Sequence, residues 1–170
     1  MNNETIINPT PAKAEAQAGK FLTFFLQDEE YGIEILKVQE IIGLMPVTRI
    51  PRTPDYVRGV INLRGKIIAV TDLRKKFGME FVDETSETCI IVVQTNGVEI
   101  GVMVDKVSEV LDIPAAEVES TPSFGSSVPT EFLLGIGNTQ SGVKLLLNIE
   151  KILSDQQLVD LCNENLAQAA

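Results

Sequence analysis

An internal repeat constrains the fold of this chain more than any other feature. Seven positions between residues 59 and 75 recur 76 residues later with the same residue types or closely similar ones, and a second block recurs 69 residues later. The chain should therefore fold as two similar units. The first block is Gly59, Asn62, Ile67, Val70, Asp72, Leu73 and Lys75, repeated as Gly135, Asn138, Val143, Leu146, Asn148, Ile149 and Lys151. The second block is Gly32, Ile33, Ile35, Lys37, Val38, Glu40 and Ile41, repeated as Gly101, Val102, Val104, Lys106, Val107, Glu109 and Val110.

Short strands surround the repeated blocks. A polar four-residue connection, Gln27 to Glu30, separates two apolar runs, and Asn96-Gly97 separates two more, so the sequence predicts two hairpins. The predicted strands are residues 21–26, 31–35, 47–50, 67–70, 89–94 and 98–104.

Helical segments are predicted in three places. Apolar residues at helical spacing predict one or two helical turns over residues 37–42. A Thr-Pro-Asp sequence that begins at Thr53 is typical of a helix start, and the helix should end near Ile61. The capping-box sequence Ser-Asp-Gln-Gln from Ser154 predicts a C-terminal helix over about 154–166.

These elements predict a mainly β fold. Two copies of about 50 residues each argue for two small barrels, because closing each sheet leaves no exposed edge strand. Cores of this size are marginal, so the barrels should pack together, share apolar side chains and leave a groove where they meet. We expect a disordered leader over 1–20, a folded domain over 21–162, a first repeat of about 21–78, a second of about 88–153, and extra loop residues within 120–130.

Composition narrows the function. The formal charge of −10, from 14 basic and 24 acidic residues, disfavours a nucleic-acid partner. The absence of histidine removes the commonest general base and metal ligand. Residues 59–66 resemble a phosphate-binding loop, but the glycine spacing is wrong and Ile67 replaces the Ser or Thr that would bind magnesium. We therefore expect no enzymatic activity, no cofactor and no metal site.

The N-terminal segment, the lengths of the apolar runs and the spacing of the cysteines indicate the cellular compartment. Residues 1–20 have neither a basic start nor an apolar run of signal-peptide length, and no later run approaches the length of a membrane span. Cys89 and Cys162 stand far apart, which favours a reducing compartment over a disulfide framework. We expect a cytoplasmic protein with no direct membrane insertion.

Arg64 is the strongest candidate for a functional side chain. It lies in a charged turn, and its repeat mate is Gln140, so the fold closes the equivalent turn without a cation. A structural role for Arg64 is therefore less favoured than a binding role. Glu40 is repeated as Glu109, so a structural or surface role is at least as well supported there.

The apolar candidates leave two interpretations open. Val38 and Val107, like Ile41 and Val110, are repeat mates that could lie in the core or line the groove between the barrels, and the sequence does not separate these roles. Gly59 is expected to allow a close backbone approach or a positive φ, which is first a requirement of the fold.

Six motifs together resemble the CheW-like family of chemotaxis coupling proteins. The similarity runs in order from about Phe21 to Leu161, and the set is specific although no single motif is. The motifs are E-Y-G-I-E-I-L-K-V-Q-E-I (30–41), V-T-R-I-P (47–51), G-V-I-N-L-R-G (59–65), V-T-D-L-R (70–74), V-D-K-V-S-E-V-L (104–111) and L-L-N-I-E-K-I-L (146–153).

The resemblance implies a fold and partners. It implies two five-stranded SH3-like β-barrels, short helices and no enzymatic activity. It implies an adaptor that links the cytoplasmic tips of methyl-accepting chemoreceptors to the regulatory domain of the histidine kinase CheA. This adaptor would work in membrane-associated arrays, and assembly into CheA/CheW rings is compatible with that role. By matching motifs, positions tied to receptor coupling are Gly59 and Arg64, with Val38 and Glu40, while Val107 and Val110 correspond to the facing side of the groove.

Two alternatives remain besides this adaptor. The first is a domain of a larger coupling or kinase protein, or a paralogue that serves another receptor array. The second is a small-molecule or oligonucleotide binder built on barrels, for which the acidic charge and the aromatic content of 5% leave little binding surface. Binding to receptor and kinase fragments distinguishes the adaptor from both.

Overall fold

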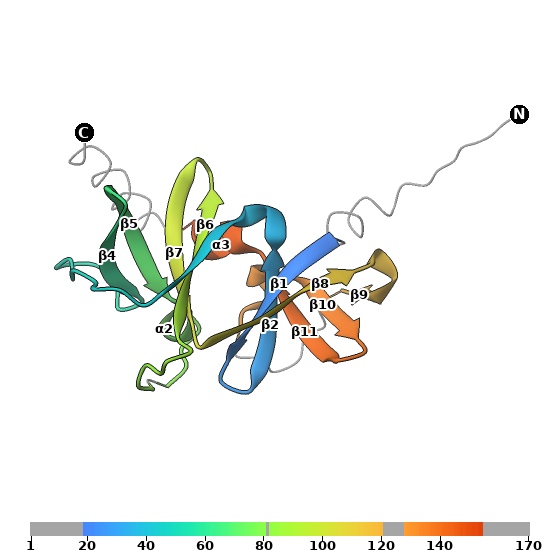
Figure 1. Ribbon diagram of the computed structural model, residues 1–170. Helices are drawn as coiled ribbons and strands as arrows, with labels where there is room; N and C mark the ends of the chain where they lie inside the picture. Colours follow the sequence, from blue (N-terminus) through green and yellow to red (C-terminus); the bar gives the residue numbers. More distant parts are fainter. Residues whose placement is uncertain (1–18, 81, 121–127, 155–170) are drawn as a thin grey trace, which may run out of the picture.

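The computed structural model describes residues 19–80, 82–120 and 128–154, and Figure 1 shows two β-sheets side by side. The first part of the chain contains β1 (Gly19–Leu26), β2 (Glu29–Glu34), the 3₁₀ turn η1 (Ile35–Lys37), β3 (Val38–Gly43), β4 (Val57–Leu63), β5 (Lys66–Asp72) and α2 (Leu73–Lys76). The second part contains β6 (Cys89–Thr95), β7 (Val98–Val104), β8 (Lys106–Ile113), η2 (Ala115–Glu117), β9 (Val118–Glu119), η3 (Thr130–Phe132), β10 (Leu133–Thr139), β11 (Gly142–Leu147) and α3 (Ile149–Ile152).

The two sheets exchange hairpins between the halves of the chain. The six-stranded sheet has the order β8-β1-β2-β11-β10-β9, and the five-stranded sheet has the order β3-β6-β7-β5-β4. In Figure 1 the blue hairpin β1–β2 lies with the orange strands, while the hairpin β6–β7 lies with the green strands. Each subdomain therefore contains strands from both sequence repeats. The architecture is the predicted pair of SH3-like subdomains, except that one sheet has six strands where five were predicted.

The pairing of the parallel strands matches the sequence repeat, because equivalent residues pair in both sheets. In the five-stranded sheet β5 and β7 are parallel, with Ala69 paired to Ile100. In the six-stranded sheet β11 and β2 are parallel, with Leu145 paired to Tyr31. Because Ala69 and Leu145 are 76 residues apart and Tyr31 and Ile100 are 69 apart, the same two repeat positions meet in both sheets. The internal repeat is therefore confirmed at the level of individual residue pairs.

Two predicted helices are wrong, and β-bulges explain why. Residues 37–42 fall mostly in β3, and the helix predicted to end near Ile61 is replaced by β4. Each of these strands contains a register shift, between Val38 and Glu40 in β3 and between Val57 and Gly59 in β4. A bulge inserts one extra residue, which turns the two-residue alternation of a strand into a spacing that imitates a helix.

Smaller differences concern the connections. The predicted strand over 47–50 is reduced to an isolated bridge between Thr48 and Val60. Thr53 does not cap a helix; its hydroxyl donates to the carbonyl of Ile50 at 2.8 Å within a turn. The first hairpin has a tighter turn than predicted, since Leu26 already pairs with Glu29. The Asn96-Gly97 turn is confirmed, with φ of 52° and 78°.

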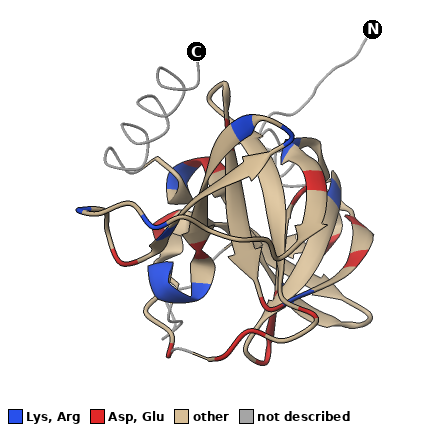
Figure 2. Cartoon of the chain, turned by 60° about the vertical axis from the view of Figure 1, so that its left-hand side comes forward, with Lys and Arg blue, Asp and Glu red and all other residues tan. Residues whose placement is uncertain are grey.

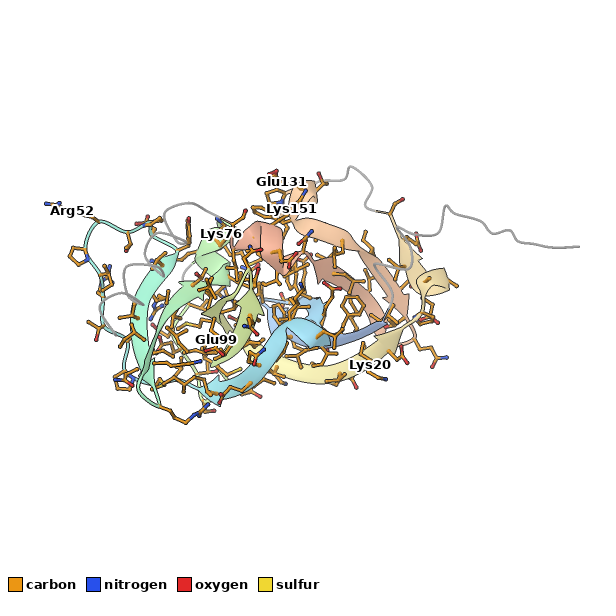
Figure 3. All side chains as sticks on the ribbon, turned by 90° about the horizontal axis from the view of Figure 1, so that it is seen from above. Lys20, Arg52, Lys76, Glu99, Glu131 and Lys151 are labelled. Carbon is orange, nitrogen blue, oxygen red and sulfur yellow. The ribbon has the colours of Figure 1, made fainter. Side chains whose placement is uncertain are left out.

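The largest of three apolar clusters among the described residues lies between the sheets. It contains buried residues of the six-stranded sheet, such as Phe24 and Tyr31, together with buried residues of the five-stranded sheet, such as Ile91 and Val102. The Tyr31 ring lies 6.0 Å from that of Phe24 and 6.1 Å from that of Phe77, which follows α2. Figure 3, which views the protein from above, shows side chains filling the space between the two sheets. The prediction that the two units share apolar side chains is confirmed.

Three predicted segments lie largely outside the described residues: the leader over 1–20, the extra loop residues within 120–130, and the C-terminal helix over 154–166. The last two residues of the predicted leader, Gly19 and Lys20, belong to β1.

Candidate functional site

Arg64 occupies a rigid two-residue turn between β4 and β5. Arg64 and Gly65 have φ of 53° and 89°, and the backbone N–H of Gly65 donates to the Asn62 side chain at 2.8 Å. Positive φ at both central residues is the geometry of tight hairpin turns that follow the twist of the strands. The Arg64 side chain is 70% exposed. The β4–β5 hairpin therefore presents the guanidinium group of Arg64 at the surface from a conformationally fixed turn.

The Arg64 guanidinium forms an ion pair with Glu40. Arg64 Nη2 donates to Glu40 Oε1, and this hydrogen bond raises the pKa of Arg64 above its ordinary value. Glu40 lies on β3, at the opposite edge of the five-stranded sheet from β4. The pair thus joins the β4–β5 turn to β3. Both Arg64 and Glu40 were candidate binding residues from the sequence, but no sequence pattern predicted that they are in contact.

The equivalent site in the six-stranded subdomain lacks this ion pair. Its turn carries Gln140 in place of Arg64, and Glu109 in place of Glu40 lies exposed on β8. Within the described residues Glu109 has no ionic partner, although its backbone N–H and carbonyl both bond the Thr23 hydroxyl, at 3.2 and 2.9 Å. The barrel therefore closes without the pair, which leaves Arg64 and Glu40 available for another role.

Gly59 has a structural reason to be glycine. Its φ is +139°, and a Cβ built there would lie 2.1 Å from the carbonyl oxygen of Thr48. The neighbouring residue Val60 exchanges two backbone hydrogen bonds of 2.8 Å with Thr48. Gly59 thus lets the segment after β3 return to β4 and close the barrel. Any link between Gly59 and a partner would pass through this backbone contact.

The four apolar candidates divide by exposure. Val38 and Val107 are half-buried and pack against the shared core. Ile41 and Val110, their neighbours three residues on, are 44% and 50% exposed. Val107 and Val110 lie on β8, at an edge of the six-stranded sheet, whereas Val38, Glu40, Gly59 and Arg64 belong to the five-stranded subdomain. A contact surface can therefore use Ile41 or Val110, while Val38 and Val107 mainly support it.

The sequence missed an ionic clamp at the junction of the subdomains. Arg74 on α2 is 8% exposed, and its Nε and Nη2 atoms lie 2.8 and 2.6 Å from the two carboxylate oxygens of Asp105. Asp105 stands where β7 passes into β8, and it also accepts from the N–H of Gln27 at 2.9 Å. The carboxylate thus bonds both subdomains. A pocket of about 420 Å³ opens beside the clamp.

The clamp has a counterpart of reversed polarity. The repeat mate of Arg74 is Glu150 on α3, whose carboxylate pairs with Lys37 Nζ at 2.6 Å. Lys37 follows Leu36, the repeat mate of Asp105. Because Glu150 replaces Arg74 and the partner charge lies one residue later, on Lys37, comparing the repeats residue by residue could not have revealed either pair.

The described residues contain no group of three or more Cys, Asp or Glu side chains placed to hold a metal ion, and the whole chain lacks histidine. None of the helices in the described part of the chain is both long and apolar enough to cross a membrane.

Comparison with known proteins points to one family. The family model of the CheW-like domain matches residues 20–157. The chain is 43% identical to the chemotaxis protein CheW of Klebsiella aerogenes over 144 residues, which cover 85% of this chain and 87% of the relative. It is 34% identical to the chemotaxis protein CheW of Helicobacter pylori over 79% of this chain and 81% of the relative.

A solved structure agrees with the fold described above. The crystal structure of the scaffolding protein TtCheW from Thermoanaerobacter tengcongensis superposes with a TM-score of 0.76 and 34% sequence identity, and the match covers 82% of this chain and 95% of that protein. The match thus extends over both subdomains. This chain therefore belongs to the CheW-like domain family.

Proposed function

We propose that this protein is a non-enzymatic adaptor of bacterial chemotaxis. In the cytoplasm it would link the tips of methyl-accepting chemoreceptors to the regulatory domain of the histidine kinase CheA, within arrays that CheA and CheW-like proteins build together. Membership of the CheW-like family supports the role, and a relative of known structure is named a scaffolding protein. The observation that carries the proposal is the exposed Arg64–Glu40 pair, which the second barrel does without.

The geometry suits recognition of a helix. An amphipathic helix binds a surface through apolar anchors at its centre and charged contacts at its rim. The half-buried Ile42, two residues after Glu40 on β3, lies on the same face of the strand as Glu40 and can provide an apolar contact. Arg64 can exchange its partner Glu40 for a carboxylate or a terminal carbonyl of the helix. Because the two-residue turn already fixes the Arg64 backbone, little backbone entropy is lost on binding.

Replacement of Arg64 tests the proposal. Arg64→Ala should weaken binding of a receptor-tip fragment about tenfold, since it removes a charge-assisted contact. The thermal midpoint should stay nearly unchanged, because exposed ion pairs contribute little to stability. Isothermal titration calorimetry and a thermal melt measure the two effects.

Gln140→Ala is the matched control, since it changes the equivalent turn of the other barrel and should affect neither quantity. A strong drop of the thermal midpoint in Arg64→Ala would show that the arginine supports the fold. Unchanged receptor binding would remove Arg64 from the contact surface.

A further inference from the structure

A second charged surface lies on the same subdomain as Arg64. Five cationic side chains, Arg49, Arg52, Arg58, Lys75 and Lys76, surround the start of β4 and the helix α2, and we name this surface the basic face. Figure 2 shows blue segments in the loop before β4 and in α2 on one side of the molecule. The first four cations line a pocket of about 310 Å³, in which Asp55 is the acidic residue. The basic face thus reverses, locally, the net charge of −10.

Part of this charge is not neutralised within the described chain. Arg58 pairs with Asp72 and Glu84, at 3.4 and 2.7 Å. By contrast, Arg49, Arg52 and Lys75 are exposed and form no ion pair with any residue that the structure describes. Lys76 Nζ lies 4.1 Å from the centre of the Tyr56 ring and 5.8 Å from that of the Phe132 ring. The cations that line the pocket stand next to apolar surface from Ile50, Pro51 and Pro54, an arrangement suited to an acidic segment with apolar side chains.

Arg52 is held in an unfavourable backbone conformation. Its φ is +66°, in the left-handed region that glycine or asparagine occupies more readily. The two flanking prolines, Pro51 and Pro54, restrict the loop on either side. Figure 3 shows Arg52 at the far tip of this loop, pointing away from the body of the protein. A loop that is stiff and strained in this way projects an arginine outward at some cost in stability, which suggests a binding role.

The basic face and the Arg64–Glu40 pair lie at opposite ends of one hairpin. β4 runs from Val57, next to the basic face, to Leu63, next to Arg64. A strand of seven residues spans about 20 Å at roughly 3.3 Å per residue. Two different protein segments can therefore contact the two surfaces at the same time, as an adaptor requires.

We propose that the basic face binds an acidic segment of the kinase regulatory domain while the receptor contacts the Arg64–Glu40 end. This inference rests on the proposed function, since an adaptor must hold both partners together. The cations come from an exposed loop, from β4 and from one helical turn, and four of them are spread over the surface of the pocket. A single phosphate would instead need several donors converging on one point. An acidic protein surface therefore fits the basic face better than a small anion does.

Association kinetics test the inference. The full-length variant Arg52→Gln/Lys75→Gln should associate with the immobilised kinase regulatory domain about tenfold more slowly than the wild type at low salt. The difference should shrink as the salt is raised from about 50 to about 300 mM, because screening removes the attraction. Binding to a receptor-tip fragment and the thermal midpoint should not change. The control Lys20→Gln/Lys106→Gln removes the same charge from the six-stranded subdomain and should associate like the wild type.

The outcomes separate this inference from the proposed function. If the wild type binds both partners and the basic-face variant associates with the kinase like the wild type, the inference is wrong and the adaptor role stands. If the variant loses receptor binding instead, the basic face belongs to the receptor and the assignment to the kinase is overturned. If the folded wild type binds neither partner, the proposed function fails, and the inference fails with it.

Discussion

Gly59→Ala should lower the free energy of unfolding by more than about 3 kcal/mol. An added Cβ would lie 2.1 Å from the Thr48 carbonyl oxygen and 2.7 Å from its carbon, and both are backbone atoms that a rotamer change cannot move. The φ of +139° is also unfavourable for alanine. The segment that closes the five-stranded barrel must therefore separate from β4 or the strand must distort. Urea denaturation followed by circular dichroism measures the loss.

Gly43→Ala is the matched control for this substitution. Gly43 ends β3 in the same subdomain, its φ is not in the left-handed region, and a Cβ there would meet no atom within 4 Å. The midpoint of denaturation should stay close to that of the wild type. If Gly59→Ala is as stable as Gly43→Ala, the contact with Thr48 is looser than described, and the resemblance-based link of Gly59 to receptor coupling would then have to be direct.

Glu30→Val should be destabilising by about 3–5 kcal/mol, because it leaves a buried ammonium without its counter-ion. Lys144 on β11 is 1% exposed, and its Nζ lies 2.6 Å from Glu30 Oε1 and 3.3 Å from the carbonyl of Ser141. The two residues are register partners in the parallel pairing of β11 with β2. Removing Glu30 leaves the Ser141 carbonyl alone to stabilise the charge. Chemical denaturation at neutral pH measures the effect.

The other barrel suggests how to rescue that variant. The repeat mate of Lys144 is Ile68, which is 2% exposed and belongs to an apolar cluster. Glu30→Val/Lys144→Ile removes both charges and should come within about 1 kcal/mol of the wild type, since an apolar pair of similar volume often replaces a buried ion pair without loss. If Glu30→Val alone costs less than about 1 kcal/mol, water must reach Lys144 and the pair is not buried in solution.

The fold was predictable from the sequence where turn residues and apolar runs define a local element. The Asn96-Gly97 turn and the two hairpins were read directly from turn chemistry and apolar runs. The helices expected at 37–42 and before Ile61 failed because bulges in β3 and β4 change the spacing of apolar residues. The exchange of hairpins between the sheets could not be predicted either. A sequence repeat identifies equivalent residues, but it does not show whether a strand pairs with its own copy of the repeat or with the other copy.

The candidate site was predictable only in part. The exchange of Arg64 for Gln140 identified the arginine, but its contact with Glu40 joins segments on opposite edges of a sheet and leaves no sequence pattern. The basic face was missed for a similar reason. Its cations come from a loop, from β4 and from a helix, at positions between 49 and 76, and a net charge of −10 gives no sign of a local basic surface.

Simultaneous binding of two partners tests the central claim most directly. The wild-type protein would be titrated by calorimetry into the kinase regulatory domain, into a receptor-tip fragment, and into each partner saturated with the other. The account predicts binding to both, with each affinity retained in the presence of the other partner, because the two proposed contact surfaces lie at opposite ends of the β4–β5 hairpin. A folded protein that binds neither partner, or that releases one when the other binds, would contradict it.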